Sequence, residues 1–540
     1  MPMIGAQAMI KCLEAEGITR VFGYPGVTIA PFYNGLYESD IEHVLVRHEQ
    51  SAGHAASGYA RMSRKTAVCC VTSGPGATNL ITALATAYAD SIPIVAITGQ
   101  VSSKLLGRDV FQEADMRGAT RSFVKHSFLV KDPDDIPRVF KEAFYIASTG
   151  RKGPVLIDIP MDVQAAELKK PFAYPDHVSI RGYKPEIKIN LIQLRKVANM
   201  LSQSEKPLIC AGGGVILGHG EEVIREFCEK FNIPLVHTMM GMGVMPKRHP
   251  LNFGMLGNNG KPYANKAVSK ADLLVVVGAR IADRSIPKPE NLTRRAVIHI
   301  DIDTAEIGKN MGPTIPLVGD LKEIFSLLIE EDIAVKDSSW ADELEVVKHE
   351  TVDTRKFSDR FVNPNVLVQT LSEKLADDAI YVADVGQNQL WSADNYIMKD
   401  GRFLTTGGMG TMGYSIPAAL GAMMACPGKQ TVAVIGDGAF QMTMNELATM
   451  KLNDIKLKVI IMKNGFLGLV KEYQHNLYDE HYMGVRLGDW PLYDKIAEAY
   501  GMSYYECDAN DKLDGVLDSF LGDPEASLLV CRIDEADRVK

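Results

Sequence analysis

Two polar side chains in the C-terminal third of the chain follow apolar runs, where they could bind a metal ion and a phosphate. Asp437, within Gly436-Asp437-Gly438, comes directly after the run 431–435, and Asn464 comes just after the run 456–462. Such runs are typical of buried parallel strands, whose carboxyl ends form one edge of a sheet. Glycines allow backbone N–H groups to approach an anion, and Mg²⁺ prefers carboxylate, amide and phosphate oxygens. A lone Gly-Asp-Gly is usually only a tight turn, but Asn464 at the next strand end favours a phosphate site with Mg²⁺.

Glu49 is a second candidate, at the point where a predicted strand meets a helix of small residues, 51–56. A carboxylate at the start of a helix usually serves only as a charge that stabilises the helix dipole. Because the residues around Glu49 are small and apolar, a buried carboxylate with a raised pKa is the alternative. The residues alone leave both interpretations open.

Two glycine-rich segments could bring the backbone close to a ligand. The segment 405–413 contains four glycines together with Met409 and Met412. This pattern indicates either close approach of the backbone or a sharply bent loop, and the methionines could be core filler. The segment 211–215 holds three glycines after an apolar run, but it lacks the full G-x-G-x-x-G pattern. Alone it is weak evidence for a nucleotide.

Sheets of buried strands must position these residues. Apolar, β-branched runs alternate with helical stretches along the chain, which predicts an α/β fold with doubly wound parallel sheets. Two stretches resemble linkers: 163–190 contains several prolines, and 331–362 is rich in charge. They divide the chain into three predicted domains, 1–165, 190–330 and 363–540.

The first and third predicted domains resemble each other, which indicates a duplication. Ser73 precedes Asp437 by 364 residues, and Gln100 precedes Asn464 by the same number. Two matches at one offset favour duplicated domains over chance. Only the C-terminal copy has a carboxylate at the turn, so we expect metal binding in that copy alone.

The composition argues against several classes of protein. The chain has 540 residues, of which 46% are hydrophobic and 23% charged, and its net charge is −9. These values favour globular domains and argue against broad binding to nucleic acid or an anionic membrane. No apolar run approaches the roughly 18 residues that a membrane-spanning helix needs, and the N-terminus lacks a signal-peptide pattern. The eight cysteines are scattered, as is typical of buried thiols in a reducing compartment, so we predict a cytoplasmic protein.

Gly436-Asp437-Gly438 followed by Asn464 resembles the motif of thiamine diphosphate enzymes, whose duplicated α/β domains bind the pyrimidine and the diphosphate of the cofactor. Within that superfamily the chain resembles the catalytic subunits of the acetolactate synthase (acetohydroxyacid synthase) family. The matching segments follow one another over nearly the whole chain: 22–26, 47–49, 72–79, 111–113, 125–126, 149–151, 153–158, 254–257, 384–387 and 410–413.

The resemblance implies three catalytic roles. Glu49 is similar to the family glutamate that hydrogen-bonds N1′ of the aminopyrimidine, where a carboxyl with a raised pKa can exchange a proton near neutral pH. The carbonyl of Gly410 would accept a hydrogen bond from N4′. Met412 resembles the bulky residue that imposes the bent conformation of the cofactor.

The resemblance also implies a metal site and a cofactor cradle. Asp437, Asn464 and the backbone oxygen of Phe466 would bind Mg²⁺. The other residues implied in cofactor binding are Tyr24, Pro25, Gly26, Gly386, Gln387, Asn388, Gly408, Gly436, Gly438 and Ala439. Because Glu49 and Asp437 lie on different predicted domains, the family arrangement is a dimer in which two chains build each site. The resemblance thus implies a homodimer or a dimer of dimers, and leaves open whether a regulatory small subunit binds.

The implied transferase reaction is decarboxylation of pyruvate and joining to a second 2-oxo acid, giving 2-acetolactate. It would serve branched-chain amino acid biosynthesis or an acetoin pathway. Arg284 matches the family arginine proposed to bind the carboxylate of the second acid. Tyr473 stands where the family often has a tryptophan that favours 2-oxobutanoate, so we expect a weak preference for that acceptor. Phe111, Gln112 and Lys125 complete the implied substrate residues.

Segments that border FAD in members of this family match only in part. The segment 280–284 reads Arg-Ile-Ala-Asp-Arg where the family has R-F-D-D-R, and 255–260 also departs from the family pattern. In contrast, 299–303 and 306–310 resemble the adenosine side of the FAD site, and we predict a flavoprotein. Two other functions stay open: another thiamine diphosphate-dependent 2-oxo acid decarboxylase or aldehyde lyase, and a non-catalytic nucleotide-binding protein. The joint presence of Glu49, Asp437 and Asn464 speaks against the last of these.

Overall fold

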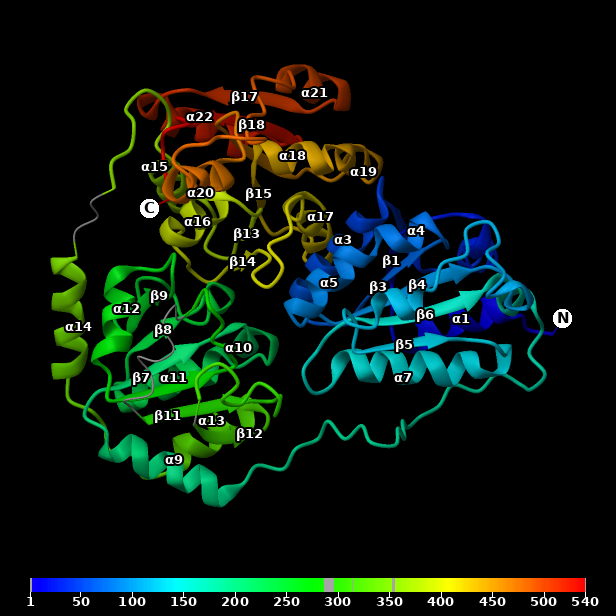
Figure 1. Ribbon diagram of the computed structural model, residues 1–540, viewed down its shortest axis with the longest axis horizontal. Coiled ribbons are helices and arrows are strands. Elements are labelled where there is room, and N and C mark those ends of the chain that lie inside the picture. Colours follow the sequence, from blue (N-terminus) through cyan, green and yellow to red (C-terminus); the bar gives the residue numbers. More distant parts are fainter. Residues whose placement is uncertain (1, 286–295, 313, 352–354, 540) are drawn as a thin grey trace.

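The computed structural model describes residues 2–285, 296–312, 314–351 and 355–539. Within these residues the chain forms three α/β domains, each built on a six-stranded sheet. Figure 1 shows them as three lobes, coloured blue to cyan, green, and yellow to red. All pairs of neighbouring strands in the three sheets are parallel, as in β1 with β3, β7 with β10, and β13 with β15. The predicted fold class is therefore confirmed.

The first domain has the strand order β2-β1-β3-β4-β6-β5. Helices α1, α2 and α7 pack on one face of its sheet, and α3 and α5 pack on the other. Its strands are β1 (Arg20–Tyr24), β2 (Glu42–Leu45), β3 (Ala67–Val71), β4 (Ile94–Gln100), β5 (His126–Leu129) and β6 (Val155–Pro160). Its α-helices are α1 (Gly5–Ala15), α2 (Ala30–Tyr37), α3 (Glu49–Ser63), α4 (Pro75–Asn79), α5 (Ile81–Ala89), α6 (Met116–Thr120), α7 (Ile136–Ser148) and α8 (Met161–Ala165).

The central domain has the strand order β12-β11-β10-β7-β8-β9. Helices α9, α11 and α13 cover one face, while α12 and α14 cover the other. Its strands are β7 (Pro207–Ala211), β8 (Leu235–His237), β9 (Asn252–Met255), β10 (Leu273–Val277), β11 (Ala296–Asp301) and β12 (Ile315–Val318). Its α-helices are α9 (Leu191–Gln203), α10 (Gly213–Leu217), α11 (Glu221–Phe231), α12 (Pro262–Lys270), α13 (Leu321–Glu330) and α14 (Ser339–Glu350).

The two stretches interpreted as linkers differ from each other. Residues 166–190 contain no helix or strand and run as extended chain from the first domain to the central one (Figure 1). The charged stretch 331–362, however, contains α14, which packs on the central sheet. Trp340 of α14 is buried, and its indole N–H donates to the carbonyl of Pro207 at 2.9 Å. One buried aromatic side chain thus anchors a segment whose composition resembles a linker.

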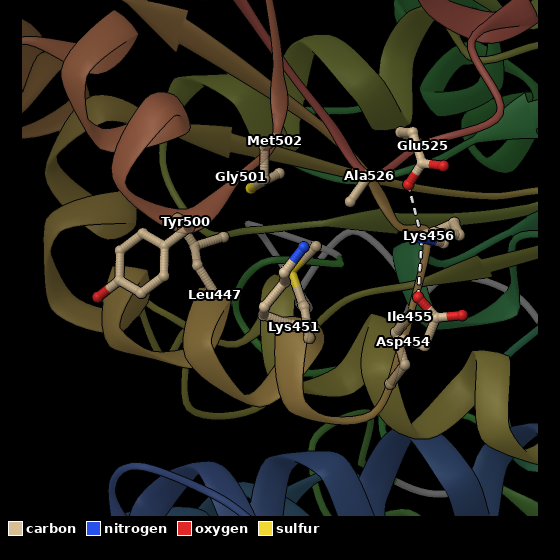
Figure 2. A pocket seen from close by; sticks show the side chains of 11 residues that line it. Leu447, Lys451, Asp454, Ile455, Lys456, Tyr500, Gly501, Met502, Glu525 and Ala526 are labelled. Atoms are coloured by element: carbon tan, nitrogen blue, oxygen red, sulfur yellow. Dashed lines mark hydrogen bonds and ion pairs between the residues drawn. The ribbon is translucent and has the colours of Figure 1, made fainter.

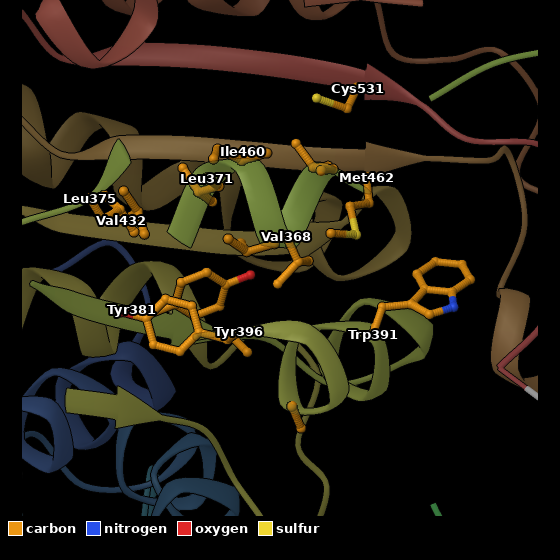
Figure 3. Close-up of a cluster of buried hydrophobic side chains, with 14 of the residues drawn as sticks. Val368, Leu371, Leu375, Tyr381, Trp391, Tyr396, Val432, Ile460, Met462 and Cys531 are labelled. Carbon is orange, nitrogen blue, oxygen red and sulfur yellow. The ribbon is translucent and has the colours of Figure 1, made fainter. Parts of the chain in front are cut away.

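The C-terminal domain has the strand order β14-β13-β15-β16-β18-β17. Its strands are β13 (Ile380–Ala383), β14 (Arg402–Leu404), β15 (Thr431–Gly436), β16 (Lys458–Lys463), β17 (Ser503–Cys507) and β18 (Ser527–Arg532). Its α-helices are α15 (Pro364–Lys374), α16 (Gln387–Asn395), α17 (Ser415–Ala425), α18 (Asp437–Thr443), α19 (Leu447–Leu452), α20 (Gly468–Leu477), α21 (Tyr493–Tyr500) and α22 (Asn510–Gly522). Figure 3 shows the core on one face, where Val368 and Leu371 of α15 lie near Ile460 of the sheet; Trp391 of α16 belongs to the same cluster.

The predicted duplication is visible in the topology. The first and third sheets have the same strand order, with β1 to β6 taking the places of β13 to β18. Strands β3 and β4 begin 364 residues before β15 and β16, which is the offset found in the sequence. The carboxyl ends of equivalent strands therefore carry Ser73 in one copy and Asp437 in the other.

The two copies meet through helices α3 and α17, which cross at two glycines. A Cβ atom added to Gly58 would collide with the carbonyl oxygen of Ala418, and one added to Gly421 would collide with that of Ala55. Each glycine thus faces an alanine of the other helix. Gly58 and Gly421 are equivalent residues 363 apart in sequence, and so are Ala55 and Ala418. The missing side chains let the two helix backbones approach closely.

We expect Gly58→Ala to lower the free energy of unfolding by about 1–3 kcal/mol, because the added methyl group overpacks the crossing. The matched control is Gly515→Ala in the exposed part of α22, where an added Cβ meets nothing within 4 Å. That control should be neutral or stabilising, because alanine has the higher helix propensity. Thermal unfolding of both variants checks the prediction, and equal midpoints would contradict it.

Among the described residues, no helix is long and apolar enough to cross a membrane. All eight cysteines are free thiols, and seven of them are buried, as the sequence predicts.

Candidate active site

Two helices of the C-terminal domain begin at neighbouring carboxyl ends of its sheet. Helix α16 starts after Gly386, whose φ of 124° strongly favours glycine, and α18 starts at Asp437 directly after β15. Asn388 links the two strand ends, because its side-chain amide donates to the carbonyls of Asp384 at 2.9 Å and Val434 at 3.2 Å. Two helix N-termini therefore share one edge of the sheet, which suits an anion such as a diphosphate.

Asp437 and Asn464 meet at this edge, as their places after neighbouring strands predict. The carboxylate of Asp437 accepts from the N–H of Gly438 at 3.0 Å and of Gly465 at 2.7 Å. The side chain of Asn464 accepts from the N–H of Phe466 at 3.0 Å and donates to the side-chain oxygen of Gln387 at 3.1 Å. The turn 464–466 thus lies against Asp437, and the predicted ligand residues belong to one cluster.

The donor set of this cluster fits Mg²⁺ together with a phosphate. Asp437 is only 3% exposed, and burial raises its pKa to about 6. Among the described residues, no group of three or more histidine, cysteine or acidic side chains could hold a metal alone. A cation here would therefore take one carboxylate, an amide oxygen and a backbone carbonyl from the protein, and further oxygens from a phosphate or water.

The segment 408–413 lies beside this cluster. The end of the Met412 side chain lies 3.6 Å from where a Cβ of Gly438 would be. Gly410 has a φ of 65°, and an added Cβ would meet only Val385, at 3.9 Å, so its backbone borders open space. Gly410 and Met412 are thus placed where a ligand held by α16 and α18 could reach them.

Buried carboxylates that the sequence analysis did not single out hold this segment at both ends. Asp384 accepts from the N–H of Gly413 at 2.9 Å and of Ser415 at 2.8 Å, and burial raises its pKa. Asp90 of the first domain accepts from the N–H of Gly408 at 2.8 Å and pairs with Arg61 at 2.9 Å. For Asp384 the sequence offers one signal of such a role, because this acidic residue directly follows an apolar run.

A separate cluster surrounds Glu49 in the first domain. Glu49 is half-buried at the first position of α3, and its carboxylate accepts from the side-chain amide of Asn79 at 3.0 Å. A Cβ added to Gly76 would lie 3.2 Å from the same carboxylate, so α4 passes close by. Asn79 lies in the matching segment 72–79, but the sequence alone assigned it no role.

The predicted cofactor residues Tyr24, Pro25 and Gly26 lie at the end of β1, beside this cluster. Gly26 packs directly against Thr72, where a Cβ would not fit. The hydroxyl of Ser73 is buried without a hydrogen-bond partner in the described part of the chain. The equivalent of Asn464 is Gln100, whose amide group donates to Asp158 at 3.0 Å and to the carbonyl of Ala114 at 2.7 Å.

The predicted substrate residues fall into three places. Gln112, with a φ of 60°, packs against Gly74, so it and the exposed Phe111 lie near the Glu49 cluster. Lys125 lies elsewhere, because its ammonium group donates to the carbonyls of Ile146 and Thr149 at the end of α7 and to Tyr183. Burial lowers the pKa of Lys125 to about 8. The substrate role of Lys125 stays a prediction.

Arg284 and Tyr473, which come from different domains, contact each other. The guanidinium of Arg284 donates to the hydroxyl of Tyr473 at 3.1 Å, and both side chains are largely exposed. The tyrosine hydroxyl therefore holds one side of the guanidinium, and Asp283 lies 3.6 Å from its Nε.

Among the described residues, no hydrogen bond or ion pair joins the Glu49 cluster to the Asp437 cluster. The first domain contacts the third through other groups: the N–H of Arg47 donates to the buried Glu446 at 3.0 Å, and Thr86 hydrogen-bonds Thr411 at 2.7 Å. We call these two clusters of one chain the half-sites.

The central domain has an acidic group at the carboxyl end of β11. Asp301 is half-buried, desolvation raises its pKa to about 6, and it accepts from the N–H of Asp303. Glu306 pairs with Arg151 of the first domain at 2.8 Å. An acidic residue at such a strand end can bind ribose hydroxyls. The glycines 212–214 lie tightly against Gly278 and Met240, so they serve close packing of the turns.

Figure 2 shows a small pocket far from these clusters, between α19, α21 and the start of β18. Its Lys456 is held by Asp454 at 2.8 Å and by Glu525 at 2.6 Å. No predicted site residue lines it.

Comparison with known proteins gives matches over the whole chain. Three family models match: the N-terminal TPP binding domain of thiamine pyrophosphate enzymes at residues 3–119, their central domain at 194–328, and their C-terminal TPP binding domain at 384–531. The probable acetolactate synthase large subunit of Methanocaldococcus jannaschii is 43% identical over 99% of this chain and 93% of its own length. The acetolactate synthase of Mycobacterium bovis is 44% identical over 95% of this chain and 85% of its own. The acetolactate synthase large subunit of Corynebacterium glutamicum is 43% identical over 90% and 79%.

Proposed function

The chain belongs to the thiamine pyrophosphate enzymes, within the acetolactate synthase family, and from this premise we propose that it decarboxylates pyruvate and joins the two-carbon unit to a second 2-oxo acid. With pyruvate as acceptor the product is 2-acetolactate. The observation that carries the proposal is the pair of half-sites: Glu49 with Asn79 in one domain, and Asp437 with Asn464 in the other. Relatives that match nearly the full chain are named for this reaction.

Thiamine diphosphate, when bound, supplies the electron sink on which a 2-oxo acid can lose carbon dioxide. The backbone N–H groups at the starts of α16 and α18, among them those of Gln387 and Asn388, would hold its diphosphate. Asp437, Asn464 and the backbone oxygen of Phe466 would bind Mg²⁺ between protein and phosphate. Gly436, Gly438 and Ala439 carry no side chain or only a methyl group, which would let the phosphate come close to the backbone at the start of α18.

Glu49 would hold and move a proton at N1′ of the aminopyrimidine, and Asn79 would orient its carboxylate. The Gly410 carbonyl would accept from the amino group, and Met412 would press the cofactor into a bent shape. Asp90 and Asp384 keep the segment that carries both residues in place. Arg284, held by Tyr473, would bind the carboxylate of the second acid.

The two half-sites support a homodimer, or a dimer of dimers, in which each site takes Glu49 from one chain and Asp437 from the other. Exposed apolar side chains support this as well: Phe111 is 87% exposed, and Met409 and Met442 are more than half exposed. Relatives are named large subunits, so we extend the proposal to a separate small subunit. Light scattering of the purified chain measures the oligomer.

FAD is part of the proposal for the central domain. Asp301 and the acidic residues after β11 fit the ribose of the adenosine half. Residues 286–295, next to Arg284, lie outside the described residues. The visible absorption spectrum of the purified protein tests this point, because bound oxidised flavin is yellow and apoprotein is colourless.

The test of function is incubation with pyruvate, thiamine diphosphate and Mg²⁺, with and without FAD. We expect acetolactate that disappears when Mg²⁺ is chelated. Acetaldehyde as the main product would instead support a plain decarboxylase.

We expect a weak preference for 2-oxobutanoate over pyruvate as acceptor, because Tyr473 is smaller than tryptophan and its hydroxyl is bound to Arg284. One methylene group is worth only about 1–3 kcal/mol of discrimination in an apolar pocket. A competition assay with equal concentrations of the two acids measures the product ratio. Tyr473→Trp should raise the share of the 2-oxobutanoate product, whereas strong preference in the wild type would contradict the prediction.

A further inference from the structure

A second cavity lies between the central domain and the C-terminal domain, and no predicted site residue lines it. It has a free volume of about 100 Å³ between β8, β9, α12, α14 and the end of α16. On this measure one water needs about 10–15 Å³, so the cavity has room for several waters or for one small organic acid.

Three lysines line this cavity. Lys261 pairs with Asp394 at 2.5 Å, and Lys348 pairs with Glu345 at 3.1 Å. Lys247 forms no ion pair among the described residues. Its ammonium group donates to the carbonyls of Asp394 and Tyr396, each at 3.0 Å, which uses two of its three hydrogens. An anion in the cavity would provide the counter-charge that this buried ammonium lacks.

Burial lowers the pKa of Lys247 to about 7, and the nearby Lys261 adds to this shift. The low pKa agrees with the hydrogen bonds, since only neutral carbonyls contact the ammonium. An anion at hydrogen-bond distance would favour the charged form.

Two further polar groups of the cavity have unused hydrogen-bonding capacity. His237 is only 7% exposed, and its Nδ1 lies 3.0 Å from the carbonyl of Thr238, which can only accept. Nδ1 therefore carries the proton, and Nε2 remains a free acceptor. The hydroxyl of Tyr263 makes no hydrogen bond within the described residues, and it lies close to Gly254 in the cavity wall. The site thus offers cations, one donor hydroxyl and one strong acceptor.

The rest of the lining is mostly apolar and adaptable. Its one further polar side chain, Asn252, is already bonded to the backbone of Met245, Pro246 and Gly254. Ala393, two glycines and four methionines make up the remainder: Met242, Met245, Met255 and Met398. Thioether side chains suit a short branched or linear aliphatic group.

We propose that this cavity binds a small aliphatic hydroxy acid. Its carboxylate would meet the ammonium groups of Lys247 and Lys348 and the hydroxyl of Tyr263, and its own hydroxyl would donate to Nε2 of His237. The lysines disfavour an amino acid of the same shape, because its ammonium group would add a positive charge to the site. Asp394 does not offset that charge, since it already pairs with Lys261 and with Arg355 at 2.8 Å.

Titration calorimetry of the full-length protein tests the site with three probes of one carbon skeleton. We expect 2-hydroxy-3-methylbutanoate to bind once per chain. 3-Methylbutanoate, which lacks the hydroxyl, should bind about 3- to 10-fold more weakly, as the loss of one hydrogen bond predicts. Valine, which carries an ammonium group in place of the hydroxyl, should also bind more weakly than the hydroxy acid.

Variants locate the binding. Lys247→Met should weaken binding of the hydroxy acid about tenfold or more. Lys247 also holds the end of α16 through the carbonyls of Asp394 and Tyr396. Lys348→Met and Tyr263→Phe leave those two hydrogen bonds intact. Each of these variants should weaken binding severalfold. Lys456→Met, in the pocket of Figure 2, is the matched control and should leave the affinity unchanged.

Three results would overturn the proposal. The first is equal affinity for all three probes, and the second is unchanged affinity in both Lys348→Met and Tyr263→Phe. The third is that Arg284→Gln loses binding of the hydroxy acid while Lys247→Met keeps it. That result would assign the bound acid to the substrate site. The proposal does not depend on which reaction the enzyme catalyses.

Discussion

Glu49→Gln is expected to lower kcat by about 10²- to 10⁴-fold, the range typical for loss of one positioned proton-transfer group. Glutamine is nearly isosteric with glutamate, and its oxygen can still accept from Asn79, so the side chain should keep its place. An amide cannot exchange a proton with N1′. Binding of thiamine diphosphate should therefore remain close to that of the wild type.

Steady-state kinetics and a cofactor titration measure the two expectations separately. Glu38→Gln is the matched control, because Glu38 is exposed at the end of α2 and belongs to no predicted site. Near-normal turnover in Glu49→Gln would exclude Glu49 as the activating group. Loss of cofactor binding would indicate that the variant disturbs the half-site itself.

Asp437→Ala is expected to abolish Mg²⁺-dependent binding of thiamine diphosphate, with a loss of affinity of about 100-fold or more. The change removes a metal ligand and also the acceptor for the N–H groups of Gly438 and Gly465. Asp437→Asn keeps an acceptor and changes mainly the charge, so it should show the same defect in metal dependence with an intact turn. Cofactor titration over a range of Mg²⁺ concentrations provides the measurement.

The duplication supplies the control for this experiment. Ser73 occupies the equivalent turn of the first domain, and its buried hydroxyl has no hydrogen-bond partner among the residues that the structure describes. Ser73→Ala should therefore leave the metal dependence unchanged. The opposite pattern, with metal dependence lost in Ser73→Ala and kept in Asp437→Ala, would reverse the roles of the two domains.

A mixture of Glu49→Gln and Asp437→Ala tests whether two chains build each site. Neither variant is active alone, but a mixed dimer would hold one site with an intact Glu49 and an intact Asp437. Equal mixing with free exchange should restore roughly a quarter of wild-type activity, because half of the dimers are mixed and each has one intact site. No recovery after exchange would place both residues of a site in the same chain.

The sequence predicts those parts of the site that follow strand ends. Asp437 and Asn464 come after neighbouring buried strands, and the geometry of a parallel sheet brings such positions together. The repeat at a constant offset likewise predicts the two equivalent sheets, because strand spacing is preserved within each copy.

Contacts between domains could not be predicted in this way. Arg284 and Tyr473 are 189 residues apart and lie on different domains, so no local pattern predicts their hydrogen bond. Asp90 and Glu446 resemble ordinary polar residues at the ends of helices, and only the packing of the domains buries them against backbone N–H groups of the other copy. For Lys125 the sequence shows a cation, whereas its carbonyl partners at the end of α7 depend on the fold.

The reciprocal crossing of α3 and α17 has a consequence for the history of this chain. Gly58 lies on Ala418 and Gly421 on Ala55, so the two copies meet as two separate molecules would across a two-fold axis. An ancestor with one such domain could have paired with itself through this helix before its gene was doubled and fused. Both turns of such a pair would be identical, and fusion would let each copy lose what the other retained. The present chain has an acidic turn only in the C-terminal copy and Glu49 at the start of α3 only in the first.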